Sequence, residues 1–217
     1  MLGARASFRS GSVLQNSAGR AYPVQVTDAT TTAEARRRWR AAALPKLRGV
    51  VLDLGAGSGI AADHLQADVT WLPLEPRRTI DRSLRDRLAH RERSRLLVAS
   101  AESIPVEAAS VDAVIASTVL CSVRRPAQVL AEVRRVLRPG GEMVFFEHVA
   151  ADAGTWTSAL QTLFAPVSRL IDHGCDPHRD TAATIRAAGF ASVELHQTTM
   201  PGVLGTVEPL IHGAAVN

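Results

Sequence analysis

A short apolar segment that runs directly into a glycine-rich loop is the feature that most limits how this chain can fold. Residues 49–54 (GVVLDL) have the length and the continuous aliphatic character of a strand buried on both faces. Gly55, Gly57 and Gly59 follow at alternate positions. Glycines at this spacing let the backbone turn tightly and bring its N–H groups close to a ligand. The segment therefore predicts a central parallel strand that ends at a ligand-binding loop.

Short apolar segments alternate with longer amphipathic ones along the rest of the chain, which is typical of an α/β sheet with crossover helices. Further strands are predicted at 69–75, 95–100, 111–117, 141–149, 190–198 and 206–216, and helices at 31–44, 60–66, 77–95, 126–137, 155–171 and 180–188. The connection between the last two strands is too short for a parallel crossover, so these strands must pair antiparallel. We predict a Rossmann-like, doubly wound seven-stranded sheet, mostly parallel, with an antiparallel C-terminal hairpin.

The length and composition are those of one globular domain. The chain has 217 residues, 46% of them hydrophobic and 21% charged, which is enough apolar material for a core. The first residues are polar and lack the apolar centre of a signal peptide. No segment approaches the roughly 20 apolar residues that cross a bilayer, so no transmembrane anchor is expected. We predict a flexible N-terminal arm over 1–30 and a single domain over 31–217.

Charge and cysteine content exclude several functional classes. The net charge is +4, but arginines alternate with acids in the densest basic segment and aromatic residues make up only 4%, which disfavours nucleic-acid binding. The two cysteines, Cys121 and Cys175, are too few for a disulfide framework and lack zinc-ligand spacing. We expect a cytoplasmic protein without a metal site, in which these cysteines pack as small apolar side chains.

An acid after the next strand indicates what the glycine loop binds. Glu75 lies twenty positions beyond Gly55, where a carboxylate accepts hydrogen bonds from both hydroxyls of a ribose. Ile60 stands where a pyrophosphate-binding loop has its last glycine. Asp53, directly before the loop, suits an ammonium, and a helix N-terminus after the loop suits a carboxylate or a phosphate. S-adenosylmethionine (SAM) carries a ribose, an ammonium and a carboxylate, so it is favoured over a dinucleotide.

Four segments resemble the class I SAM-dependent methyltransferases with a methyltransferase type 11 domain: VLDLGAGSG at 51–59, SAESIP at 100–105, ASVDAVIAS at 109–117 and VLRPGGEMVFFEH at 136–148. The resemblance implies a seven-stranded sheet with a closing antiparallel hairpin. It also implies SAM as cofactor and S-adenosylhomocysteine (SAH) as product.

The same resemblance implies roles for individual residues. Gly55, Ala56, Gly57 and Gly59 would pass close to the methionine part of SAM, with Asp53 helping to hold it. Glu75 would bind the ribose and Pro76 would lie near the adenine. Ala101 and Glu102 would border the adenine edge, and Ser117, Thr118 and Val119 would face the transferring methyl group.

A narrower resemblance suggests the methyl acceptor. TVLCSV at 118–123, FEHVA at 146–150 and PLIHGAAV at 209–216 are similar, in order and spacing, to the methyltransferase-like 7 proteins. Those are thiol S-methyltransferases that act on small alkyl or aryl thiols. The resemblance implies S-methylation of a small-molecule thiol. Their hydrophobic N-terminal membrane anchor is not carried over to this chain.

A thiol acceptor needs a group that helps it to lose its proton, because the thiolate is the nucleophile. His148 lies at the carboxyl end of the last parallel strand and is the best-placed candidate. His173 and His178 lie on the segment expected to cover the acceptor pocket. An O-, N- or C-methyltransferase of a natural product, quinone or lipid headgroup is an alternative. A nicotinamide-dependent dehydrogenase is disfavoured, and a non-catalytic SAM-binding protein stays open.

Overall fold

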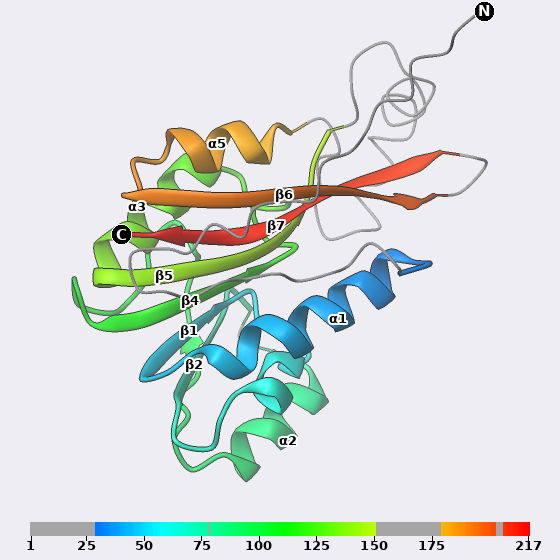
Figure 1. Ribbon diagram of the computed structural model, residues 1–217. Helices are drawn as coiled ribbons and strands as arrows, with labels where there is room; N and C mark the ends of the chain where they lie inside the picture. Colours follow the sequence, from blue (N-terminus) through cyan, green and yellow to red (C-terminus); the bar gives the residue numbers. More distant parts are fainter. Residues whose placement is uncertain (1–28, 78, 151–178, 203–205) are drawn as a thin grey trace, which may run out of the picture.

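The computed structural model describes residues 29–77, 79–150, 179–202 and 206–217. They form a seven-stranded sheet in the order β3-β2-β1-β4-β5-β7-β6, with helices on both faces (Figure 1). The strands are β1 (Val50–Leu54), β2 (Thr70–Glu75), β3 (Leu97–Val98), β4 (Val111–Ser117), β5 (Leu137–His148), β6 (Ser192–Pro201) and β7 (Val207–Val216). The helices are α1 (Thr32–Ala43), α2 (Arg82–His90), α3 (Pro126–Val136) and α5 (Thr181–Ala187), with 3-10 helices η1 (Leu44–Lys46) and η2 (Ile60–His64).

The sheet has the predicted topology. Strands β1 to β5 pair parallel with their neighbours, whereas β7 runs antiparallel to both β5 and β6. The predicted C-terminal hairpin is therefore confirmed. Leu54 pairs with Leu74 on one side and with Ala116 on the other, and Ser117 pairs with Phe146. This register brings the carboxyl ends of β1, β2, β4 and β5 to one edge of the sheet, where the candidate site lies.

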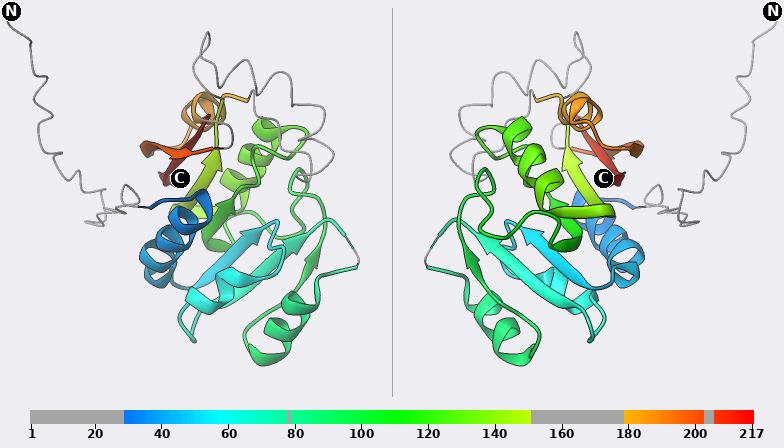
Figure 2. Two further views of the ribbon diagram at one scale, coloured as in Figure 1. Left: turned by 90° about the vertical axis from the view of Figure 1, so that its right-hand side faces the viewer. Right: turned by 90° about the vertical axis from the view of Figure 1, so that its left-hand side faces the viewer.

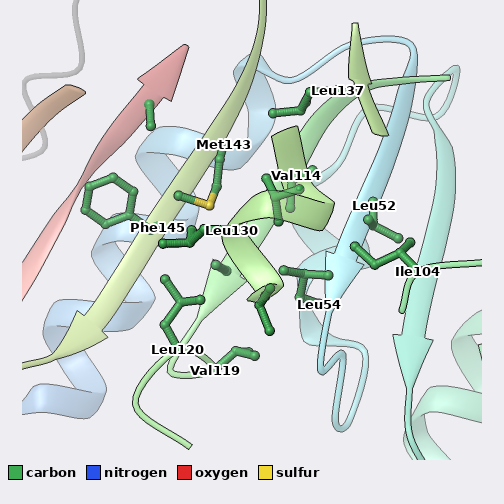
Figure 3. Packing of buried hydrophobic residues seen from close by; sticks show 14 of the residues in the cluster. Leu52, Leu54, Ile104, Val114, Val119, Leu120, Leu130, Leu137, Met143 and Phe145 are labelled. Atoms are coloured by element: carbon green, nitrogen blue, oxygen red, sulfur yellow. The ribbon is translucent and has the colours of Figure 1, made fainter. Parts of the chain in front are cut away.

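Each face of the sheet has its own apolar core. Leu52, Leu54 and Phe145 point to the face covered by α3 and α5. Figure 3 shows this core, with Val119 and Leu120 close to the carboxyl ends of the strands. The opposite face packs against α1, η2 and α2. The two side views show these helix layers on either side of the sheet (Figure 2).

Helix α1 matters most for the site because it lies over the carboxyl half of the central strands. Thr31 caps its N-terminus by accepting a hydrogen bond from the Glu34 N–H at 3.2 Å. Trp39 is buried against Phe146 of β5, with ring centroids 5.7 Å apart. The Thr32 hydroxyl donates to the Glu208 carboxylate of β7. These contacts fix α1 against the sheet.

Several predicted boundaries were wrong. The predicted helix at 60–66 is only η2, five residues of 3-10 helix that start after Gly59 in the left-handed region, with no side-chain cap. The helix η2 is short, and Ala61 within it and Leu65 directly after it are both buried in the core before the chain continues to β2. Helix α2 is shorter than 77–95, and β3 has two residues. Strand β5 begins at Leu137 rather than at 141, because Leu137 pairs with Val111 before a register shift.

Two predictions fall largely or wholly outside the described residues. They are the flexible arm over 1–30 and the helix over 155–171. Within the described residues, no helix is long and apolar enough to cross a membrane.

Candidate functional site

The glycine loop after β1 uses its glycines for conformation. Gly55, Gly57 and Gly59 all have positive φ, at +56°, +57° and +76°, a region that other residues enter at a cost. A Cβ on Gly59 would meet Leu84 at 2.8 Å, so this glycine is also required by packing. A Cβ on Gly57 would meet only the Gly55 oxygen, at 3.8 Å. The exposed surface above Gly57 is thus open for a ligand, with Ala56 half-buried beside it.

Glu75 ends β2 beside this loop. Its carboxylate accepts a hydrogen bond from the Gly57 N–H at 2.5 Å, which holds the loop against the strand. The side chain is only half-buried, and Pro76 after it is exposed. A half-buried carboxylate that already fixes the loop leaves further acceptor positions for a hydroxyl-bearing ligand.

Asp53 lies near the end of β1, two residues before Gly55, and its surroundings are unusual for a carboxylate. It is only 4% exposed and accepts a hydrogen bond from the Trp71 indole N–H at 3.2 Å. Burial raises the pKa of the Asp53 carboxyl to about 7, which the Trp71 hydrogen bond and the Arg40 charge only partly offset. Because the pKa of this buried carboxyl is close to 7, a cation that binds next to it would strongly favour the ionised form.

The segment after β4 carries backbone strain. Thr118 has a φ of +59°, which is a genuine outlier for a β-branched residue. Its N–H donates to the Phe146 oxygen at 2.8 Å, and its hydroxyl donates to the Ser117 oxygen at 2.6 Å. Val119 then packs against the glycine loop, 3.1 Å from where a Gly55 Cβ would lie. Val119 is therefore next to the glycine loop.

Glu147 holds this strained segment in place. Its fully buried carboxylate accepts hydrogen bonds from the N–H groups of Val119 and Leu120 at 2.9 and 3.0 Å, and from Cys121 at 3.4 Å. Burial raises the pKa of the Glu147 carboxyl to about 8, Cys121 adds to the rise, and the three N–H donors oppose it. From the other side, the Arg179 guanidinium donates to the Leu120 oxygen at 3.0 Å. Sequence motifs gave no sign of this support.

His148 ends β5 beside the same segment and contacts the Cys121 thiol. Burial lowers the pKa of the His148 imidazole, but the hydrogen bond with Cys121 and the charges of Glu147 and Glu208 more than offset it, and the pKa ends above its ordinary value. Cys121 is buried as predicted, yet its thiol also interacts with a titratable neighbour. His173 and His178 lie outside the described residues.

The loop after β3 carries the last pair of predicted residues. Ala101 and Glu102 are half-buried. The Glu102 carboxylate accepts a hydrogen bond from the Ser100 hydroxyl. Burial raises the pKa of Glu102, but this bond and the backbone N–H groups of residues 102, 124 and 125 outweigh it and leave the pKa below its ordinary value. The Glu102 carboxylate thus already has hydrogen-bond partners, and its backbone oxygen accepts a hydrogen bond from the Gln128 side chain at 2.9 Å.

Two arginines of α1 reach the same edge, and sequence reasoning missed them. The Arg36 guanidinium donates to the Thr118 hydroxyl at 3.3 Å, and the Arg40 guanidinium donates to the Ser117 hydroxyl at 3.4 Å. They line a cavity of about 620 Å³ between α1 and η2. A hollow of about 930 Å³ lies at the opposite end of the strands, near Thr70 and Ser110, and contains none of the candidate residues.

Comparison with known proteins decides the family. A family model described as a methyltransferase domain matches residues 52–145. The human thiol S-methyltransferase TMT1B is 35% identical over 170 residues, which cover 76% of this chain and 70% of the relative. Human TMT1A is 33% identical over the same coverage. The chain belongs to the class I SAM-dependent methyltransferases. SAM is its cofactor.

The fold of this methyltransferase agrees with that assignment. The phosphoethanolamine N-methyltransferase 2 of Haemonchus contortus, solved with SAH, superimposes with a TM-score of 0.63 at 14% identity over 79% of this chain and 49% of that one. The described residues also fit the cofactor. The open surface above Gly57, the half-buried carboxylate of Glu75 and the buried Asp53 offer donors and acceptors of the kinds that a nucleoside and an amino acid require.

Proposed function

We propose that this methyltransferase transfers the methyl group of SAM to a small-molecule thiol. Its curated relatives are named as thiol S-methyltransferases. The observation that carries the proposal is His148, an imidazole with a raised pKa at the carboxyl end of β5, beside the strained segment after β4. A raised imidazole pKa lies closer to that of a thiol, which is ordinarily about 8.5, and this makes the imidazole a better base for the thiol proton.

The cofactor half of the site would bind through the residues that the sequence singled out. In this proposal the backbone of Gly55, Ala56, Gly57 and Gly59 approaches the methionine part, and Asp53 faces its ammonium. Glu75 accepts hydrogen bonds from the ribose hydroxyls. Pro76, Ala101 and Glu102 border the adenine, while Ser117, Thr118 and Val119 lie next to the reacting methyl group. The half-buried position of Glu75 and the left-handed glycines support this arrangement.

The acceptor half would prepare and align the thiol. SAM, when bound, would supply a methyl group on a sulfonium: the acceptor sulfur would bond to the methyl carbon in line as the bond from that carbon to the sulfonium sulfur breaks and SAH leaves. A ring nitrogen of His148 takes the proton of the thiol and holds it while the thiolate reacts. Glu147 keeps the backbone at residues 119–121 in one conformation, so that the acceptor meets a preformed wall. Alignment and exclusion of water are the main contributions that a protein makes to such a displacement.

The setting of the reaction is also a proposal. We place the enzyme in the cytoplasm, because two cysteines in 217 residues are too few for the disulfide framework of a secreted domain. We also expect no nucleic-acid partner, because arginines alternate with acids in the most basic segment. His173 is a second candidate for the acceptor side.

Release of SAH from SAM in the presence of defined acceptors tests the acceptor class. The protein is incubated with SAM and matched series of alkyl and aryl thiols, phenols and amines. Turnover is expected with the thiols, and each thiol should give a methyl thioether in amounts equal to the SAH formed. Turnover with a phenol or an amine but with no thiol would contradict the proposal and leave the methyltransferase assignment intact.

A further inference from the structure

Arg36 and Arg40 place two positive charges side by side on α1, and the buried Asp53 offsets the charge of Arg40 only in part. They lie four residues apart on α1 and so project from the same face of the helix. Among the described residues, neither forms an ion pair with a carboxylate, since the nearby Glu34 pairs with Arg38 at 2.6 Å. The contacts that they do make, to Thr118 and Ser117, are long and go to neutral hydroxyls. Like charges at this spacing repel each other.

Burial makes the pair more costly still. Arg40 is partly buried. Burial and the charge of Arg36, opposed by Asp53, together lower the pKa of its guanidinium to about 10. The Arg36 Nε atom is buried without a hydrogen-bond partner, one of two such side-chain atoms in the described part of the chain. A buried donor left unsatisfied is expensive. Both arginines border the cavity of about 620 Å³ beside α1, so a ligand has room to reach them.

The short helix after the glycine loop leaves a role open. The sequence predicted a helix N-terminus near residue 60 that would favour a carboxylate or a phosphate. The structure has five residues of 3-10 helix there, without a cap, and so short an element has little dipole to offer. Ile60 and His64 of η2 instead line the cavity opposite the arginines. The cationic groups at this edge are therefore supplied by α1.

We infer that Arg36 and Arg40 form a carboxylate-binding site above the carboxyl end of β4. A planar guanidinium presents paired N–H donors that match the two oxygens of a carboxylate. One bound carboxylate removes the repulsion between the two arginines and gives the Arg36 Nε a partner. The carboxylate comes from the methionine part of the cofactor or from an acidic group on the acceptor. The inference rests on the methyltransferase assignment but not on the thiol proposal.

Binding of SAH, measured by calorimetry, tests the site without any acceptor. Arg36→Gln and Arg40→Gln are compared with wild type and with Arg85→Gln, which removes the same charge from an exposed position on α2. The same proteins are titrated with an SAH analogue that lacks the carboxylate. If the cofactor supplies the carboxylate, each α1 variant binds SAH about 10- to 100-fold more weakly, as expected for loss of a charge-assisted hydrogen bond. The analogue should bind wild type and variants alike.

Acceptor kinetics identify the other source. If the acceptor supplies the carboxylate, SAH affinity stays unchanged while KM for a carboxylate-bearing acceptor, of whichever class the enzyme methylates, rises at least about 10-fold. KM for a neutral acceptor of similar size then stays constant. Thermal midpoints of the α1 variants should equal or exceed that of wild type, because repulsion has been removed. Unchanged SAH affinity together with an unchanged KM ratio in both variants would overturn the inference, whatever acceptor the enzyme proves to use.

Discussion

The carboxyl edge of the sheet has two halves that are built differently. On the β1–β2 side, the features that suit a ligand are backbone features, three glycines with positive φ and a loop N–H held by Glu75. On the β4–β5 side, they are side chains, with the buried Glu147 under the strained segment and the half-buried His148 against Cys121. Backbone contacts recognise what every cofactor molecule has in common, whereas buried polar side chains are specific to one reaction. We therefore assign cofactor binding to the β1–β2 side and acceptor chemistry to the β4–β5 side of the carboxyl edge of the sheet.

A glycine substitution on the β1–β2 side should have the largest effect. Gly57→Arg places a long side chain on the open surface above the loop, and we expect SAH binding to weaken by more than about 100-fold. Both the positive φ of +57° and the loss of the ligand's space contribute. Calorimetry with SAH measures the loss.

Gly140→Arg is the matched control. Gly140 also has a positive φ, +75°, and a Cβ there would meet nothing within 4 Å, but it lies at the other end of β5. Both variants carry a similar backbone strain, on the order of 1 kcal/mol, so their stabilities should fall alike. Only Gly57→Arg should lose affinity for SAH. Equal SAH affinity in the two variants would remove the loop from the cofactor site.

The two halves also differ in how far the sequence predicts them. The glycine loop is a local feature: Gly55, Gly57 and Gly59 lie within five residues of one another, so the tight turn that they form can be predicted from their spacing. The C-terminal hairpin could also be predicted, because a short connection between two strands allows only antiparallel pairing. Glu147 and residues 119–121 are nearly thirty positions apart and meet only because β4 and β5 pair. Their arrangement depends on tertiary register, which no local pattern records.

The α1 arginines show the same limit in another form. The helix itself was predicted from its threonine cap and its good helix formers, and Thr31 does cap it. Nothing in that pattern says which face meets the sheet edge. Burial of Trp39 and Ala35 fixes the rotation of α1, and this rotation turns Arg36 and Arg40 toward β4. Arginine-rich segments also occur on solvated helices, so composition does not distinguish arginines that face a site from arginines that face solvent.

A substitution on the β4–β5 side should leave cofactor binding intact and reduce turnover. His148→Gln removes the proposed base, and we expect kcat/KM for a thiol to fall by about 10²- to 10⁴-fold with SAH affinity within about 2-fold of wild type. In wild type, activity should rise with pH and level off above the raised pKa of His148. The variant should instead follow the ionisation of the thiol, near pH 8.5.

His212→Gln serves as the control for losing a buried histidine. His212 is 4% exposed on β7, and burial lowers the pKa of its imidazole to about 4, so it is neutral across the assay range. This variant should keep the wild-type pH profile. A shift of the profile in His212→Gln, or a wild-type profile in His148→Gln, would take the base away from His148.

Substitution of Asp53 gives the smallest expected loss, in SAH affinity, together with a change in stability of the opposite sign. Because its pKa in the folded protein is about 7 and its ordinary value is 3.8, the folded state holds a proton between these values that the unfolded state has lost. The stability from this proton is fully present below about pH 4 and is lost as pH rises through 7. Asp53→Asn never ionises and can still accept from Trp71. The variant should therefore be more stable than wild type at pH 8, by up to about 4 kcal/mol, and should show less than half of that gain at pH 5.

The same substitution should weaken SAH binding by about 10-fold, because the carboxylate that faces the ammonium is gone. Urea unfolding at pH 5 and pH 8 without ligand, followed by calorimetry with SAH, measures both effects. Asp68→Asn, at an exposed position, controls for the general change in charge. A gain in stability with a loss of affinity means that the protein keeps a destabilising buried charge for the sake of its ligand. If stability and affinity fell together, Asp53 would be part of the structural core, and the cofactor half would consist of backbone and Glu75 alone.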